Sequence, residues 1–143
     1  MVLKVDFISK DIKNKWFKNN HSIEINYIER ILKAMHIPAV VKEGFEADDI
    51  IGTLAKQAEK QGYVTYMVTP DKDFAQLVSE NIFMYKPSRM GNGIEIWGIP
   101  EVQKNFEIER PEQVIDFLAM KGDAVDNIPG LPGVGDKTAK LFL

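Results

Sequence analysis

Short apolar runs alternate with helical patterns along the first half of this chain, and this alternation restricts the fold more than any other feature. The runs at 37–41 (IPAVV) and 64–69 (VTYMVT) predict buried strands. Apolar residues spaced three and four apart predict helices over about 23–36 and 46–61, and Gly62 stops the second. Strands that alternate with helices favour an α/β domain with a mainly parallel sheet flanked by helices.

The second half of the chain predicts smaller elements. A short helix is expected at about 73–79, followed by a β-hairpin over 81–98 around a Gly-Asn-Gly turn. Pro111 is typical of a helix start, and another helical pattern begins at about Asp136. Because the sequence stops inside that last pattern, we expect the chain to be a piece of a longer protein.

Composition excludes several classes of site. The 143 residues suffice for one hydrophobic core with a small appended module. Without cysteine the chain has no disulfide, thiolate zinc site or cysteine nucleophile, and two histidines cannot form a histidine-rich metal site. No apolar run approaches the roughly 20 residues of a membrane span, so we expect a cytoplasmic protein without membrane contact. The net charge of −3 argues weakly against a simple nucleic-acid binder.

Three acidic motifs lie beside glycine or proline at expected strand and helix ends. They are EADD with Glu46, Asp48 and Asp49, PDKD with Asp71 and Asp73, and GDAVDN with Asp123 and Asp126. Taken singly, each motif also fits a helix cap, a turn or a polar loop, since acids stabilise the first turn of a helix. In parallel sheets, however, binding groups gather beyond the carboxyl ends of the strands.

Seven carboxylates that converged there would repel one another unless divalent cations lay between them. Ligation by carboxylates alone suits Mg²⁺ or Mn²⁺, and two such ions can act on a phosphodiester. Without these seven acids the net charge of −3 becomes +4, so a metal-loaded protein could present a basic face to DNA. The convergence is inferred from the order of the motifs, and if it holds the two ions could clamp the attacking water and the leaving oxygen of a phosphodiester.

The stretch PGLPGVGDKTAKL at 129–141 predicts a phosphate-binding turn. Gly133 and Gly135 allow a tight turn, and the N–H groups of the following helix form an anion site beside Lys137 and Lys140. A helix-hairpin-helix holds nucleic-acid phosphates in this way without reading bases. The alternative is an ordinary glycine-rich loop before a helix.

With these motifs in order, the chain from about Ile31 to Leu143 resembles the 5′-nuclease domains of bacterial DNA polymerase I, which belong to the flap endonuclease family. The strings that carry the resemblance are GFEADDIIGTLAKQAEKQGY, VTPDKDFAQLVS and FLAMKGDAVDNIPGLPGVGDKTAKLFL. The resemblance implies a PIN-like core over 1–110 and a helix-hairpin-helix (helix-three-turn-helix) module over 111–143 that is cut short at its end.

The resemblance also implies an activity and a set of site residues. The activity would be metal-dependent hydrolysis of DNA in 5′ flaps and nicked duplexes, as part of a DNA polymerase I in replication and repair. Mg²⁺ or Mn²⁺ would be held by the seven acids: Glu46, Asp48, Asp49, Asp71, Asp73, Asp123 and Asp126. Duplex DNA, commonly with K⁺, would be held by Gly133, Gly135, Lys137 and Thr138. Of the seven acids, Asp71 and Asp73 are our catalytic candidates. Lys72 is added for its position between them, from which it could reach a phosphate or pair with a neighbouring acid.

The first thirty residues depart from the family pattern. The family's first strand ends in VDG with a metal-binding aspartate, and a basic YKxxR arch follows later; neither occurs here in recognisable form. Asp6 is a candidate for the first ligand, and the lysines around Trp16 and Phe17 could replace the arch or form a solvated face. Two alternatives to the nuclease therefore remain, a metal- and DNA-binding module that does not cut and an interaction domain whose acids only cap and turn.

Overall fold

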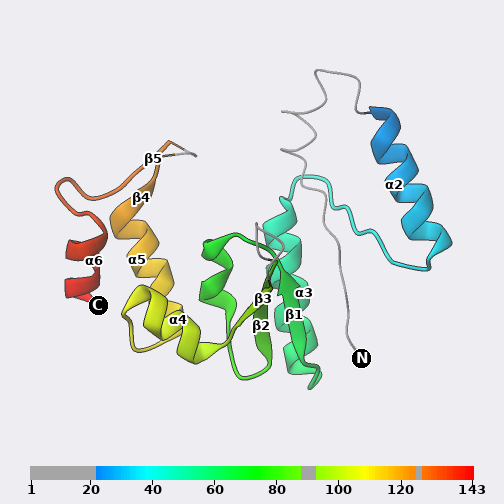
Figure 1. Cartoon of the computed structure of the whole chain (residues 1–143). Helices are drawn as coiled ribbons and strands as arrows, with labels where there is room; N and C mark the ends of the chain where they lie inside the picture. Colours follow the sequence, from blue (N-terminus) through cyan, green and yellow to red (C-terminus); the bar gives the residue numbers. More distant parts are fainter. Residues whose placement is uncertain (1–21, 88–92, 125–126) are drawn as a thin grey trace. The chain divides into compact units, whose positions relative to one another are not determined.

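The computed structural model describes residues 22–87, 93–124 and 127–143 (Figure 1). By its internal contacts the chain divides into two compact units, Met1–Val68 and Thr69–Leu143. The predictions for residues 1–21, including Asp6 and the lysines beside Trp16, lie outside the described residues. The same holds for Asp126 and for the turn of the expected hairpin.

The described part of the first unit, from Ser22 onward, contains two helices and one strand: α2 (Ser22–Ala34), α3 (Ala47–Lys60) and β1 (Thr65–Val68). α3 follows its sequence prediction closely, because Glu46 forms the N-cap and Gly62 adopts a left-handed φ of 79° just beyond the last turn. β1 packs against α3 and buries Met67, which is 4% exposed. The apolar face of α3 is thus turned toward a strand, as its periodicity predicts.

The strand predicted at 37–41 is not formed. This segment has no regular secondary structure, and Val41 is 77% exposed. α2 ends when His36 takes a left-handed φ of 56° and the Ile37 N–H bonds back to the Leu32 carbonyl. A strand must pair its backbone groups with a neighbour, and among the described strands none pairs with 37–41. Apolar composition alone therefore gave a wrong prediction here.

The second unit begins with the 3₁₀ helix η1 (Lys72–Leu77), followed by β2 (Ile82–Pro87), β3 (Ile94–Trp97) and α4 (Ile99–Phe106). β2 and β3 pair in antiparallel register, with Met84 opposite Trp97 and Lys86 opposite Glu95. This pairing confirms the predicted hairpin. The second described pairing in this unit is also antiparallel, so the mainly parallel sheet stays a prediction within an architecture that is mixed α/β.

The chain then forms η2 (Pro111–Gln113), α5 (Val114–Lys121), β4 (Gly122–Asp123), β5 (Ile128–Pro129) and α6 (Asp136–Phe142). Pro111 starts a 3₁₀ turn that continues into α5, close to the predicted helix start. Phe117 of α5 packs edge-to-face on Phe106 of α4, with ring centroids 5.3 Å apart. Phe117 is buried, whereas Ile115 of the same helix is exposed.

Two glycines let the chain pass close to itself after α5. Gly122 has a φ of 72°, and a side chain there would press on the Gly130 backbone and lie 2.6 Å from the Ile128 carbonyl oxygen. A side chain at Gly130 would strike the Lys121 carbonyl and lie 2.7 Å from the Met120 carbonyl oxygen. The Leu131 N–H bonds to that same Met120 carbonyl at 2.8 Å. These contacts fix the loop that leads into α6.

Candidate metal centre and nucleic-acid interface

The first acidic motif surrounds the start of α3. Glu46 precedes the helix, Asp48 and Asp49 lie in its first turn, and all three are exposed. An Asp49 carboxylate oxygen accepts a hydrogen bond from the Glu46 N–H at 3.0 Å. Asp49 therefore caps the helix, which is the structural role that such an acid is expected to have. The cap uses Oδ2 of Asp49 and is compatible with further ligation by the carboxylates of this motif.

The second motif forms the start of η1, and Asp71 is its N-cap. Asp71 Oδ1 accepts a hydrogen bond from the Asp73 N–H at 3.0 Å, while the Asp71 N–H donates to Thr69 Oγ1 at 3.1 Å. Gln76 Nε2 donates a hydrogen bond to the Asp73 carbonyl oxygen at 2.9 Å. Asp71 is exposed, whereas Asp73 is partly buried with its Oδ1 shielded from solvent. The PDKD turn is thus fixed by hydrogen bonds on both sides of its two acids.

The third motif follows α5 directly. Asp123 lies in β4, partly buried and opposite Ile128 of β5. Because α5 contacts η1, the second and third motifs belong to elements that pack within one unit. The first motif belongs to the other unit, so the convergence of all seven acids stays a prediction. Among the described residues, no three acidic or histidine side chains already lie together as a metal site.

The donor chemistry nevertheless fits one class of metal. Every predicted ligand is a carboxylate, and the chain has no cysteine. Oxygen ligands of this kind suit hard cations such as Mg²⁺ and Mn²⁺ and do not favour copper or a thiolate zinc site. The turn that carries Asp71 and Asp73 is already ordered by hydrogen bonds from backbone N–H groups to the side-chain oxygens of Thr69 and Asp71. The residues present therefore fit a divalent hard cation.

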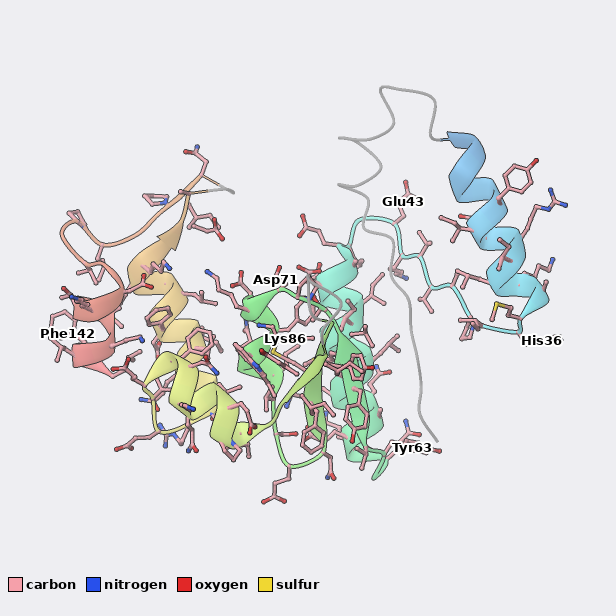
Figure 2. The ribbon with its side chains drawn as sticks, in the orientation of Figure 1. His36, Glu43, Tyr63, Asp71, Lys86 and Phe142 are labelled. Atoms are coloured by element: carbon pink, nitrogen blue, oxygen red, sulfur yellow. The ribbon has the colours of Figure 1, made fainter. Side chains whose placement is uncertain are left out.

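A lysine that sequence reasoning missed lies beside this turn. Lys86 of β2 places its Nζ 3.5 Å from the centre of the Trp97 ring, and Trp97 Nε1 donates to Glu95 Oε2 at 3.1 Å. Burial lowers the pKa of Lys86, while the carboxylates of Glu95 and Asp71 act in the opposite direction. Figure 2 labels Asp71 and Lys86 within the second unit. A signal for it was in the sequence, because Lys86 continues the alternating row of Ile82 and Met84.

The candidate nucleic-acid interface is the loop before α6. Gly133 has a φ of 79° with open space around its Cα, and Gly135 is the extended N-cap of α6. Lys137 is exposed and Thr138 is partly buried in the first turn. The buried Ala139 anchors the helix. The structure thus presents Lys137 to solvent beside an open glycine turn.

Two ion pairs hold α6 in place. Lys121 lies 2.8 Å from Asp136 at the start of α6, and a hydrogen bond from Lys121 lowers the pKa of that aspartate. Lys140 lies 2.8 Å from Glu107, so this lysine is engaged within the protein. We had expected Lys140 to add charge to the phosphate site, and this pairing gives it a structural role instead.

A membrane span is not among the described elements. Within residues 22–87, 93–124 and 127–143, no helix has both the length and the apolarity that crossing a bilayer requires.

Comparison with protein families matches two consecutive segments of the chain. The family described as the 5′-3′ exonuclease N-terminal resolvase-like domain matches residues 17–107, which is more than half of the chain. The 5′-3′ exonuclease C-terminal SAM fold matches residues 109–143.

Curated relatives carry two names. A DNA polymerase I of Rhizobium leguminosarum is 45% identical over 125 residues, which cover 84% of this chain and 11% of that protein. A 5′-3′ exonuclease of Aquifex aeolicus is 42% identical, with 82% of this chain and 39% of that protein covered. A 5′-3′ exonuclease of Buchnera aphidicola is 40% identical over all of this chain and 51% of its own length. The chain thus spans between about a tenth and a half of these relatives.

Solved structures show the same fold at low identity. The bacteriophage T5 5′-exonuclease with bound zinc has a TM-score of 0.68 at 19% identity, covering 94% of this chain and 51% of the other. A T5 flap endonuclease complex with DNA and metal ions has a TM-score of 0.67 at 18% identity, covering 93% and 51%. The two family matches, taken with the mixed α/β structure, lead to one assignment. This chain belongs to the 5′-3′ exonuclease family, with a resolvase-like N-terminal part and a C-terminal part of the SAM fold.

Proposed function

We propose that this chain forms most of a metal-dependent, structure-specific 5′ nuclease that hydrolyses DNA phosphodiesters in 5′ flaps and nicked duplexes. The observation that carries the proposal is the ordered PDKD turn, whose two acids are set by hydrogen bonds in an element that packs against α5. Its relatives named DNA polymerase I support a role in replication and repair, with polymerase domains continuing the full-length protein. A DNA substrate also favours the cytoplasm as its location.

The predicted ligands divide between the two units. Divalent cations would be held by Glu46, Asp48 and Asp49 from the first and by Asp71, Asp73, Asp123 and Asp126 from the second. When bound, Mg²⁺ or Mn²⁺ supplies an activated water and charge stabilisation for the leaving oxygen. The T5 structures with zinc and other metal ions support divalent metal use, and the donor set favours Mg²⁺ or Mn²⁺. The protein's part is to fix the carboxylates before metal and DNA arrive.

The remaining roles concern DNA. Lys72, between the two acids of PDKD, would contact the phosphate, and in the absence of DNA it lies in the electrostatic field of Asp136. Gly133, Gly135, Lys137 and Thr138 would hold the duplex backbone, with K⁺ as a further ligand of the turn. The family matches at 17–107 and 109–143 support a division into a nuclease core, 1–110, and this module, 111–143.

A second candidate is a domain that holds metal and DNA but does not cut. The observation that favours it is the N-terminal sequence, where the family's first metal-binding aspartate and basic arch have no recognisable counterpart. Losing a metal ligand and two cations removes charge stabilisation of the transition state, which usually supplies the largest catalytic term. The two candidates differ in turnover and agree on metal binding.

Cleavage of a labelled 5′-flap duplex tests the proposal. We expect cutting with Mg²⁺ or Mn²⁺ and none with EDTA. Asp71→Asn should lower the rate at least about a hundredfold, because it removes a metal ligand. Asp116→Asn is the matched control, since Asp116 is an exposed aspartate of α5 outside the motifs. Full activity of Asp71→Asn would contradict the proposal. Mn²⁺ binding without cutting would establish the second candidate.

A further inference from the structure

Lys86 occupies a position where the strand pattern calls for an apolar residue. Side chains alternate between faces along a strand, so Ile82, Met84 and Lys86 share one face of β2. Ile82 and Met84 are 0% exposed, and Lys86 is the partly buried residue at the end of that row. Removing an ammonium group from water there costs free energy, which interactions with other groups must offset. The surroundings of Lys86 must therefore supply compensating interactions.

Two residues of β3 supply them. Lys86 Nζ lies 3.5 Å from the centre of the Trp97 ring, a close cation–π contact. Glu95 is directly opposite Lys86 in the antiparallel register, and its carboxylate fixes the indole through the 3.1 Å bond from Trp97 Nε1. The contact with the ring and the attraction of the Glu95 carboxylate together favour this position of the ammonium group. Lys86 is therefore a localised positive charge on the hairpin.

That charge lies beside the PDKD turn. The Thr69 N–H donates to the carbonyl of Tyr85, the residue just before Lys86, at 3.2 Å. Thr69 Oγ1 in turn accepts the Asp71 N–H at 3.1 Å. These two bonds connect the backbone next to Lys86 with the backbone of Asp71, both within the second unit (Figure 2). The Asp71 carboxylate also lies in the electrostatic field of Lys86.

We propose that Lys86 is a positioning residue, the resident counter-cation of the Asp71 carboxylate, with which a divalent metal ion must compete. This inference rests on the proposed metal-dependent function. In the metal-free protein the ammonium group offsets the repulsion between neighbouring carboxylates. A divalent ion at this site would be repelled by the same ammonium group, which the contact with Trp97 holds nearby. Lys86 thus lowers metal affinity and so sets the concentration at which the site fills.

Binding of Mn²⁺ alone tests the inference without using nuclease activity. Free Mn²⁺ is measured by electron paramagnetic resonance during titration of the wild-type chain, Lys86→Met and Lys104→Met. Lys104 is an exposed lysine of α4 in the same unit and serves as the matched control. We expect Lys86→Met to bind Mn²⁺ at least about threefold more tightly, because it removes a nearby positive charge. Lys104→Met and the conservative Lys86→Arg should keep the wild-type affinity.

A role in packing alone gives a different result. In that case Lys86→Met would lower the melting temperature and leave Mn²⁺ affinity unchanged or weaker, and either outcome in a folded variant overturns the inference. If Lys86→Met does not fold, Lys86→Gln removes the same charge and takes its place in the titration. In an Asp71→Asn background the gain from Lys86→Met should be smaller, because the competition for the Asp71 carboxylate is gone and only the direct repulsion of the ion by Lys86 remains. If the wild-type protein does not bind Mn²⁺, both the proposed nuclease function and the proposed role of Lys86 are overturned. If Lys86→Met binds Mn²⁺ more tightly but the wild-type protein does not cleave the flap, only the nuclease function is overturned.

Discussion

Gly130 shows how a single residue can decide whether the loop before α6 forms. Its Cα lies so close to the end of α5 that an added methyl group would meet the Met120 and Lys121 carbonyls. Gly135, five residues later in the same loop, has open space at the corresponding position. Both are simply glycine in the sequence, and only the structure distinguishes a glycine needed for close approach from one that is not.

We therefore expect Gly130→Ala to lower the free energy of unfolding by about 1–3 kcal/mol, the usual cost of forcing extra atoms into a packed region. Urea unfolding followed by circular dichroism measures this change. Gly135→Ala is the control, because its φ of −104° is open to any residue, and it should change stability by less than about 1 kcal/mol. Equal effects of the two substitutions would contradict the structural distinction.

The PDKD turn shows what residue-scale sequence reasoning achieves. Capping and metal binding were weighed as alternatives for Asp71, yet the carboxylate that caps Asp73 through Oδ1 has a second oxygen. The two roles can therefore coexist on one side chain. Lys86 was missed for a different reason. Its neighbours Glu95 and Trp97 reach it across a hairpin, and cross-strand contacts depend on register, which alternation alone does not fix.

At the scale of elements, predictions succeeded where local signals were strong. α3 has a capped start, a periodic apolar face and a terminating glycine, and the hairpin has two alternating runs. The strand predicted at 37–41 was wrong for a different reason. Its apolar residues resemble a strand, but a strand also needs a pairing partner elsewhere in the chain. Helix boundaries come from neighbouring residues, whereas strand formation needs a second strand.

The pair between Lys121 of α5 and Asp136 of α6 gives an element-scale prediction. The hydrogen bond from Lys121 lowers the pKa of Asp136. The pair therefore stabilises the folded protein fully above the ordinary aspartate pKa of about 3.9. That stabilisation is lost as the pH falls through the lowered value in the folded protein. Because both side chains are partly exposed, Lys121→Met should cost only about 0.2–1 kcal/mol at neutral pH.

Thermal unfolding from pH 7 down to pH 3 measures this effect. The difference between the wild-type chain and Lys121→Met should shrink toward acid pH and also in about 1 M salt, where exposed charges are screened. Lys104→Met, which carries the same charge change, controls for net charge. A difference that stays constant with pH would mean that Lys121 acts through packing.

At the scale of the whole molecule, charge and DNA binding must be reconciled. The net charge is −3, but the seven candidate ligands account for more than this excess, and neutralising them leaves +4. Divalent metal should therefore strengthen DNA binding by more than its local contacts would. The net charge follows from the sequence alone. Which lysines stay available to DNA depends on the fold, because ion pairs within the protein occupy some of them, as Glu107 pairs with Lys140.

Lys137 gives the matching prediction. It is exposed in the first turn of α6, so Lys137→Met should weaken duplex binding about equally for all sequences. The slope of the logarithm of affinity against the logarithm of salt concentration should fall by about 1, the value expected for one lost phosphate contact. Fluorescence anisotropy across a salt series with Ca²⁺ present measures this slope, and Lys104→Met should leave it unchanged. An unchanged slope in Lys137→Met would remove this residue from the interface.

The contact between Lys86 and Trp97 has a practical consequence for spectroscopy. The chain has two tryptophans, Trp16 and Trp97, and the indole of the second has an ammonium group on its face and a carboxylate on its nitrogen. Indole fluorescence depends on nearby charges, so any event that shifts Lys86 should change the emission wavelength and quantum yield of Trp97. With Trp16 replaced by Phe, the protein would report Mg²⁺ arriving at its own candidate site, in real time and without an attached dye.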